Sequence, residues 1–161
     1  MESSLFYILA SVTVIATALA ITEKHAVHAI VYLVTSFFAL AVIFFMLGAP
    51  VVAVFEVIIY AGAIMVLFLF VIMMLDLGHP ERARLPGVRE WWPALVLGAV
   101  TLAAALTLFA SRAPAALTAG KAIGVKEFAL ALLGKYGVAV EVISMQLLFA
   151  LVGALYLAKK R

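Results

Sequence analysis

Five stretches of hydrophobic residues, separated by polar connections, make up most of the chain. They predict membrane-spanning helices at residues 5–22, 26–47, 51–75, 93–110 and 138–158. About 20 apolar residues at about 1.5 Å each match a hydrocarbon core of about 30 Å, so each run is close to the length that a crossing needs. Residues 126–136 are too short to cross and predict an amphipathic segment on the membrane surface. We therefore expect an all-α polytopic membrane protein, with residues 1–161 forming a single membrane domain.

Turn and interface residues mark the ends of these runs. Gly48-Ala49-Pro50 predicts a tight turn in which proline leads the third span. Trp91-Trp92-Pro93 predicts an aromatic anchor at the membrane interface before the fourth span. The first run is as apolar as a signal peptide, but Glu2 and no Lys or Arg stand before it. Because the basic segment of a signal peptide is missing, we expect a retained span.

Basic residues in the connections predict the orientation. With five crossings, one side of the membrane carries four of them, namely Arg112, Lys121, Lys126 and Lys135. The other side carries seven, namely Lys24, Arg82, Arg84, Arg89, Lys159, Lys160 and Arg161. Since Lys and Arg are enriched in cytoplasmic loops, we expect the N-terminus outside and the C-terminus in the cytoplasm of a bacterial inner membrane.

Composition supports the membrane class and excludes several functions. Hydrophobic residues make up 68% of the chain and charged residues 12%, against roughly 45–50% and 25% in soluble domains. No polar connection is long enough for a soluble catalytic domain of roughly 50 residues. The net charge of +3 follows from the loops, and no basic face interleaved with aromatic residues predicts a nucleic-acid partner. We expect no catalytic residue on this chain.

Metal and cofactor ligands are few in the sequence. There is no cysteine, which excludes disulfides and thiolate ligation of iron–sulfur clusters or zinc. His25, His28 and His79 lie in or next to short connections, with no cluster of carboxylates of the kind that accompanies a metal site. We therefore interpret the three histidines as interfacial or solvated side chains, and predict no metal site.

The third span carries a single ionisable residue, Glu56, between Val51 and Leu75. A carboxylate in hydrocarbon costs on the order of 2.5 kcal/mol or more unless it is protonated, paired or hydrated. Glu56 and Tyr60 are four residues apart, which predicts one helix face continued by Ala63 and Leu67 and directed away from lipid. Two interpretations follow: Glu56 joins two helices by a hydrogen bond, or it is a stop on a proton or water path.

Gly62 lies near the middle of the same span, between two alanines. Glycine inside a helix is less favourable than alanine by roughly 1 kcal/mol, so we expect a structural reason for it. Close packing against a neighbouring helix is one use, and a one-turn π-bulge is another. Composition favours packing, because small residues recur at helical spacing at Ala94 and Gly98 and again at Ala150 and Ala154. Many such surfaces predict partner subunits as well as the lipid bilayer.

The run from Glu56 to Leu75 closely resembles the third transmembrane helix of the J-type subunit of respiratory complex I, NADH:quinone oxidoreductase, a relative of mitochondrial NADH dehydrogenase subunit six. The resemblance extends more loosely over the five-span layout and over Phe128 to Leu155. It implies a membrane-arm subunit of a proton-translocating enzyme, with other membrane-arm subunits as partners. It also implies no redox cofactor on this chain, since FMN, iron–sulfur clusters and quinone would belong to partner subunits.

The resemblance further implies a π-bulge in the third helix, around the residues that match Tyr60 and Gly62. We expect Tyr60, Gly62, Ala63, Met65 and Val66 to form a coupling segment that changes between bulged and regular forms. Removing one inserted residue rotates the helix beyond it by about 100°, so apolar side chains would exchange faces and open or close a water wire. A proton-carrying role for Glu56 extends this hypothesis.

Three other functions remain as alternatives. A related cation antiporter or membrane-bound hydrogenase complex would use a similar helix. A free-standing small transporter is a second alternative, although the sequence shows no half-to-half repeat. A structural adaptor that holds larger subunits together is the third.

Overall fold

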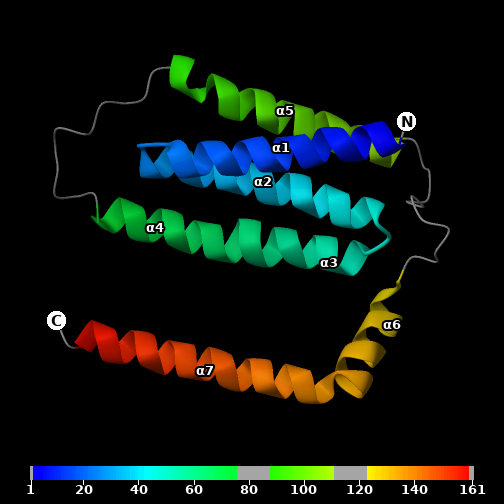
Figure 1. Ribbon diagram of the computed structural model, residues 1–161, viewed down its shortest axis with the longest axis vertical. Helices are drawn as coiled ribbons and strands as arrows, with labels where there is room; N and C mark the ends of the chain where they lie inside the picture. Colours follow the sequence, from blue (N-terminus) through cyan, green and yellow to red (C-terminus); the bar gives the residue numbers. More distant parts are fainter. Residues whose placement is uncertain (1, 76–87, 111–122, 160–161) are drawn as a thin grey trace. The chain divides into compact units, whose positions relative to one another are not determined.

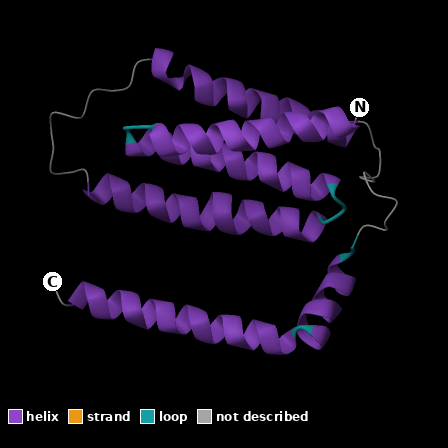
Figure 2. Cartoon of the chain, in the orientation of Figure 1, coloured by secondary structure: helices purple, strands orange, loops and turns teal. Residues whose placement is uncertain are grey.

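The computed structural model describes residues 2–75, 88–110 and 123–159, and every regular element in these ranges is helical (Figure 2). Five helices are long and apolar enough to cross a membrane: Ser3–Thr22, Ala26–Met46, Pro50–Leu75, Trp91–Leu108 and Gly137–Lys159. The prediction of an all-α polytopic fold with five spans is confirmed. His79, and Arg82 and Arg84 among the basic residues used for the orientation, lie outside the described residues.

The described chain divides into two compact units, residues 1–122 and 123–161. The first contains α1 (Glu2–Thr22), α2 (Ala26–Met46), the third span and α5 (Val88–Ala110) (Figure 1). The third span consists of three pieces, α3 (Pro50–Phe55), η1 (Glu56–Ile64) and α4 (Met65–Leu75). Helix α2 is central, because it contacts α1, α5 and all three pieces of the third span.

Small side chains let the helices of the first unit approach closely. Ala16 and Ala39 are fully buried, and Ala104 is 5% exposed. The core consists of Leu9, Val12, Ala39, Ile43, Met46 and Ala104. Without a hydrophobic driving force in lipid, such small-residue contacts and interhelical hydrogen bonds hold spans together. One such bond joins α1 to α2, where the hydroxyl oxygens of Thr17 and Ser36 are 2.9 Å apart.

The turn between α2 and the third span follows from its sequence. Gly48 has a φ of 78°, a conformation that glycine adopts without strain. Its N–H donates to the carbonyl of Phe45 (3.2 Å), and the N–H of Ala49 donates to that of Phe44 (3.1 Å). These two bonds form the Schellman motif that satisfies the last carbonyls of a helix. Pro50 then starts α3 at a position where its missing N–H costs nothing, as the sequence predicts.

Helix α5 begins earlier than predicted. It starts at Val88, so Pro93 lies inside the helix rather than at its start. Proline removes one hydrogen bond to the carbonyl four residues back, and here this loss falls close to the helix end and does not terminate the helix. Trp91 therefore belongs to the helix itself. Its ring packs edge-on against His28 of α2, with the ring centroids 4.9 Å apart.

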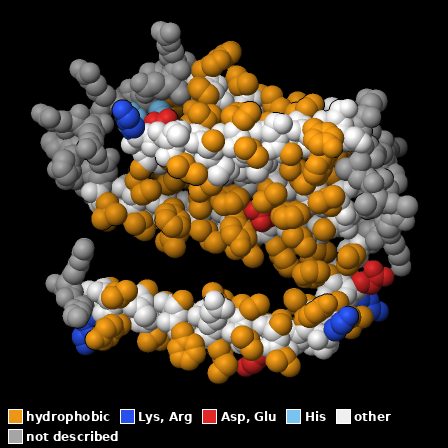
Figure 3. All heavy atoms as spheres, in the orientation of Figure 1, with side chains coloured by type: hydrophobic (Ala, Val, Ile, Leu, Met, Phe, Trp, Pro, Cys, Tyr) orange, Lys and Arg blue, Asp and Glu red, His pale blue; other side chains and the backbone are white. Residues whose placement is uncertain are grey.

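The second unit contains α6 (Val125–Leu130), η4 (Ala131–Lys135) and α7 (Gly137–Lys159). The predicted surface segment 126–136 is therefore helical, and it ends where the N–H of Tyr136 donates to the carbonyl of Ala131. None of the described residues of this unit is buried. Hydrophobic side chains cover most of the visible surface of the described helices (Figure 3). Such surfaces suit contact with lipid or with partner helices.

Candidate functional site in the third span

The third span departs from α geometry at its middle. Residues Glu56–Ile64 form a nine-residue π-helix, η1, between the α-helical pieces α3 and α4. The N–H of Met65 is directed to the carbonyl oxygens of Gly62 and Tyr60, and the second of these is five residues back, as in a π-helix. Such segments are rare and frequently lie at functional sites. The π-helical piece of the third helix, which the family resemblance implied, is therefore present.

Gly62 lies close to the carbonyl group of Val57. A Cβ atom at this position would lie 3.2 Å from the carbonyl oxygen of Val57. Apart from the adjacent residues and the nearby backbone of the same helix, no other atom of the described chain would lie within 4 Å of it. Val57 is five residues earlier, so its carbonyl is the one that a π-helix brings beneath residue 62. No neighbouring described helix of this chain lies within 4 Å of that Cβ position, so a packing contact at Gly62 would involve a helix of another subunit. A side chain at residue 62 would require the carbonyl of Val57 to shift by a few tenths of an ångström.

The π-helix changes which side chains share the buried face. The buried residues of the third span are Ala53, Glu56, Ala61 and Met65. Between Glu56 and Ala61 the spacing is five residues rather than the three or four of an α-helix. Glu56 is buried as predicted, whereas Tyr60, four residues later, is more exposed than a face directed wholly away from lipid would make it. Tyr60 is 46% exposed, and its ring lies beside that of Phe37 in α2, with the centroids 5.5 Å apart.

The other residues of the predicted coupling segment are divided between the two faces. Met65 is 7% exposed, whereas Val66 is 61% exposed and Ala63 is exposed. Leu67, predicted on the face of Glu56, is also 61% exposed. The prediction missed Ala61, which takes the buried place that an α-helix would give to Tyr60. Its only signal in the sequence is its place in the small-residue run beside Gly62.

Glu56 is the first residue of η1 and is 8% exposed. Within the described residues, no hydrogen bond to its carboxyl group is present, so none of these residues supplies the partner that a role in joining two helices requires. Although the residue as a whole is buried, its carboxyl oxygens are not among the fully buried polar atoms of the described chain that lack a partner. Its partner would therefore be water or a group from another subunit.

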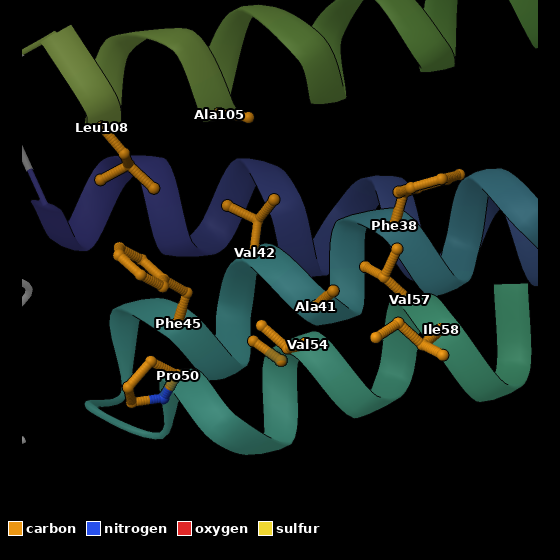
Figure 4. A pocket seen from close by; sticks show the side chains of 11 residues that line it. Phe38, Ala41, Val42, Phe45, Pro50, Val54, Val57, Ile58, Ala105 and Leu108 are labelled. Atoms are coloured by element: carbon orange, nitrogen blue, oxygen red, sulfur yellow. The ribbon is translucent and has the colours of Figure 1, made fainter. Parts of the chain in front are cut away.

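An apolar cavity of about 480 Å³ lies beside the start of η1 (Figure 4). It opens between α2, the first half of the third span and α5, and its lining side chains are Phe38, Ala41, Val42, Phe45, Pro50, Ala53, Val54, Val57, Ile58, Ala105 and Leu108. A water molecule needs two to four polar partners, and these side chains provide none. The cavity therefore gives the neighbouring helix room to move but no water path in this form.

Comparison with known proteins agrees with the family resemblance noted in the sequence. Residues 16–157 match the family of NADH-ubiquinone/plastoquinone oxidoreductase chain 6. The chain belongs to this family. NADH-quinone oxidoreductase subunit J of Pseudomonas aeruginosa is 42% identical over 160 residues, covering 96% of this chain and 95% of the relative. The subunit J of Escherichia coli K12 is 38% identical over 160 residues, covering 96% and 85%. The resemblance seen in the sequence is confirmed, and the chain is a membrane subunit of complex I.

Membership of this family fits the features described above. The match spans the first four membrane helices from within α1 and most of α7, so it covers both units of the chain. The relatives are subunits of an oxidoreductase complex by name. Together with five apolar helices, this identifies a multi-pass protein of the bacterial inner membrane.

Proposed function

We propose that this subunit couples quinone reduction to proton pumping by changing its third span between a π-helical and an α-helical form. The observation that carries the proposal is η1 itself, where Gly62 leaves space for the carbonyl of Val57. A π-helical segment is rare because it is less favourable than an α-helix, and such segments are frequently found at functional sites. The residues around it therefore form the moving part.

The change of form would exchange side chains at the surface of α2. Removing the extra residue of η1 rotates the helix beyond it by about 100°. Tyr60 would then take the buried place of Ala61, and Ile64 that of Met65. The ring of Tyr60, which already lies beside Phe37 of α2, would replace the methyl group of Ala61 at the buried position. Val66 would change its position with the same rotation. Such an exchange is the kind of discrete rearrangement that closes or opens a path between packed helices.

The cavity beside η1 makes this rotation feasible. Closely packed helices resist a change of volume, because interiors are filled to crystal-like density. Here Val57 and Ile58 face about 480 Å³ of space, so the start of η1 can shift without displacing a packed neighbour. Glu56 lies at the same point and, in the proposed mechanism, passes a proton through water that enters when the segment rotates.

The remaining roles are assigned to partner subunits. We infer that FMN, the iron–sulfur clusters and quinone are held elsewhere in the complex, since a chain without cysteine offers no thiolate for a cluster. No catalytic residue is assigned to this chain. The loop charges support an N-terminus outside and a C-terminus in the cytoplasm. Other membrane-arm subunits would cover the apolar surfaces that this chain leaves exposed.

Copurification tests the assignment of partners. An affinity tag on the chain, expressed in its own membrane and extracted in mild detergent, is expected to retain many different polypeptides together with NADH:quinone reductase activity. Mass spectrometry of the retained chains and an activity assay provide the measurement. Recovery of the chain alone or as a homo-oligomer would instead support a free-standing transporter.

A further inference from the structure

A group of metal-ligating side chains lies at the turn between α1 and α2, away from the third span. Glu23, His25 and His28 each offer one ligand atom, and these atoms lie within 4.8 Å of one another. The sequence predicts no cluster of carboxylates beside these histidines, and the structure places one carboxylate, that of Glu23, beside two of them. The sequence spacing gives little sign of this, because the turn folds Glu23 back toward the first residues of α2.

The carboxylate of Glu23 is held in place by the backbone. Its Oε1 atom accepts hydrogen bonds from the N–H groups of Lys24 (2.9 Å) and His25 (3.2 Å). The bond from the His25 backbone is the main cause that lowers the pKa of Glu23 below its ordinary value. Its side chain is only 25% exposed. The carboxylate thus has both the charge and the fixed position of a ligand.

His25 lies at the right distance for a shared ion. Its Nδ1 atom is 3.4 Å from Oε1 of Glu23. Two ligands bound at about 2.0–2.1 Å to a tetrahedral ion are about 3.3 Å apart, so this pair already has the separation of two corners of a zinc site. The side chain of His25 is 61% exposed. An ion can therefore reach the pair directly from water.

His28 completes the group from the buried side. It is 5% exposed, and its Nε2 atom has no hydrogen-bond partner among the described residues. Leaving such a group unsatisfied costs about 1–3 kcal/mol, and imidazole is a common metal ligand. The ring is held edge-on by Trp91 of α5, while its centroid lies 5.6 Å from that of His25. The ring is thus fixed beside the other two ligands.

We propose that Glu23, His25 and His28 bind a Zn²⁺ ion at the membrane surface, with water as the fourth ligand. Two imidazoles and one carboxylate form a zinc ligand set with an open position, whereas Mg²⁺ and Ca²⁺ take oxygen ligands. The three ligand atoms lie within 4.8 Å of one another, and the site closes when side-chain rotation brings them to the tetrahedral spacing of about 3.3 Å. The site ties the α1–α2 turn to the first turn of α2. It does not depend on the proposed coupling role of the third span.

Zinc binding to the purified assembly that contains the full-length chain tests this site. The protein is stripped with a chelator, dialysed against micromolar Zn²⁺ and analysed for metal per copy of the chain. We expect the wild type to retain one equivalent more than the Glu23→Gln/His25→Gln double variant. The single variant His25→Gln, which alters only an exposed side chain, is expected to weaken this equivalent at least tenfold.

Lys24→Ala is the matched control, since it changes the same turn without removing a ligand, and it should bind zinc like the wild type. Equal zinc in the wild type and in the double variant would overturn the proposal, as would the absence of any zinc from the wild type. An assembled complex in each variant, checked by its subunit content, shows that a loss of zinc is not a loss of the protein.

Discussion

Gly62→Leu is expected to lower coupled NADH:quinone reductase activity and proton pumping roughly 5- to 150-fold while the complex remains assembled. A Cβ atom at residue 62 would lie 3.2 Å from the carbonyl oxygen of Val57, which is close only because the π-helix places that carbonyl beneath it. Overpacking of this kind costs about 1–3 kcal/mol. Because the penalty applies to the π-helical form, the variant shifts the third span toward the α-helical form and holds it there. Proton uptake by vesicles and quinone reduction by the same membranes provide the measurement.

Gly98→Leu is the matched control for this result. Gly98 lies in α5, where an added Cβ atom would meet no atom within 4 Å and where a neighbouring cavity of about 260 Å³ offers room for a larger side chain. We expect near-normal activity in this variant. Gly62→Ala adds the Cβ atom alone and should give a smaller loss of the same kind. Normal pumping in a fully assembled Gly62→Leu complex would count against a role for the π-helix in turnover.

Glu56→Gln is expected to reduce proton pumping on the order of tenfold, equivalent to about 1.4 kcal/mol on the barrier, with assembly unchanged. Glutamine has the shape of glutamate and keeps its hydrogen-bonding capacity, but it cannot release a proton. Glu56 is buried and has no partner in the described chain, so its ionisable group is the property that the substitution removes. Vesicle acidification, measured against the rate of quinone reduction, separates pumping from electron transfer.

Glu56→Ala separates a proton role from packing. If the side chain only fills space, alanine should disturb assembly or stability while glutamine behaves as the wild type. If it carries protons, both variants should pump poorly, and glutamine should do so in a complex of normal stability. Normal pumping by both variants would leave Glu56 with packing at most.

The membrane layout could be predicted from the sequence because hydrophobic length alone determines it. The five runs coincide with the five helices to within a few residues at most ends, and the turn at Gly48 and Pro50 follows from the backbone needs of these two residues. The start of α5 was predicted at Pro93 rather than Val88, because proline is favoured in the first turn of a helix. One proline near the end of a long helix costs a single hydrogen bond, and the surrounding apolar run outweighs it.

The candidate site could be predicted only in part, because its geometry depends on an irregular register. Helical spacing placed Tyr60 beside Glu56, whereas the inserted residue of η1 gives that place to Ala61. Nothing in the spacing of Gly62 distinguishes a packing contact from a π-helix; the family resemblance supplied that choice. The cluster of Glu23, His25 and His28 depends on how one turn folds back, and residue spacing does not determine that.

The backbone hydrogen bonds of the third span, resolved in the intact complex during turnover, test the central claim most directly. Images of the enzyme frozen with NADH and quinone should separate into two populations. In one, the N–H of Met65 would bond to the carbonyl of Tyr60, as in η1. In the other it would bond to that of Ala61, with Tyr60 in the buried place that Ala61 now takes. A single π-helical register from Glu56 to Ile64 in every population of the working enzyme would contradict the account.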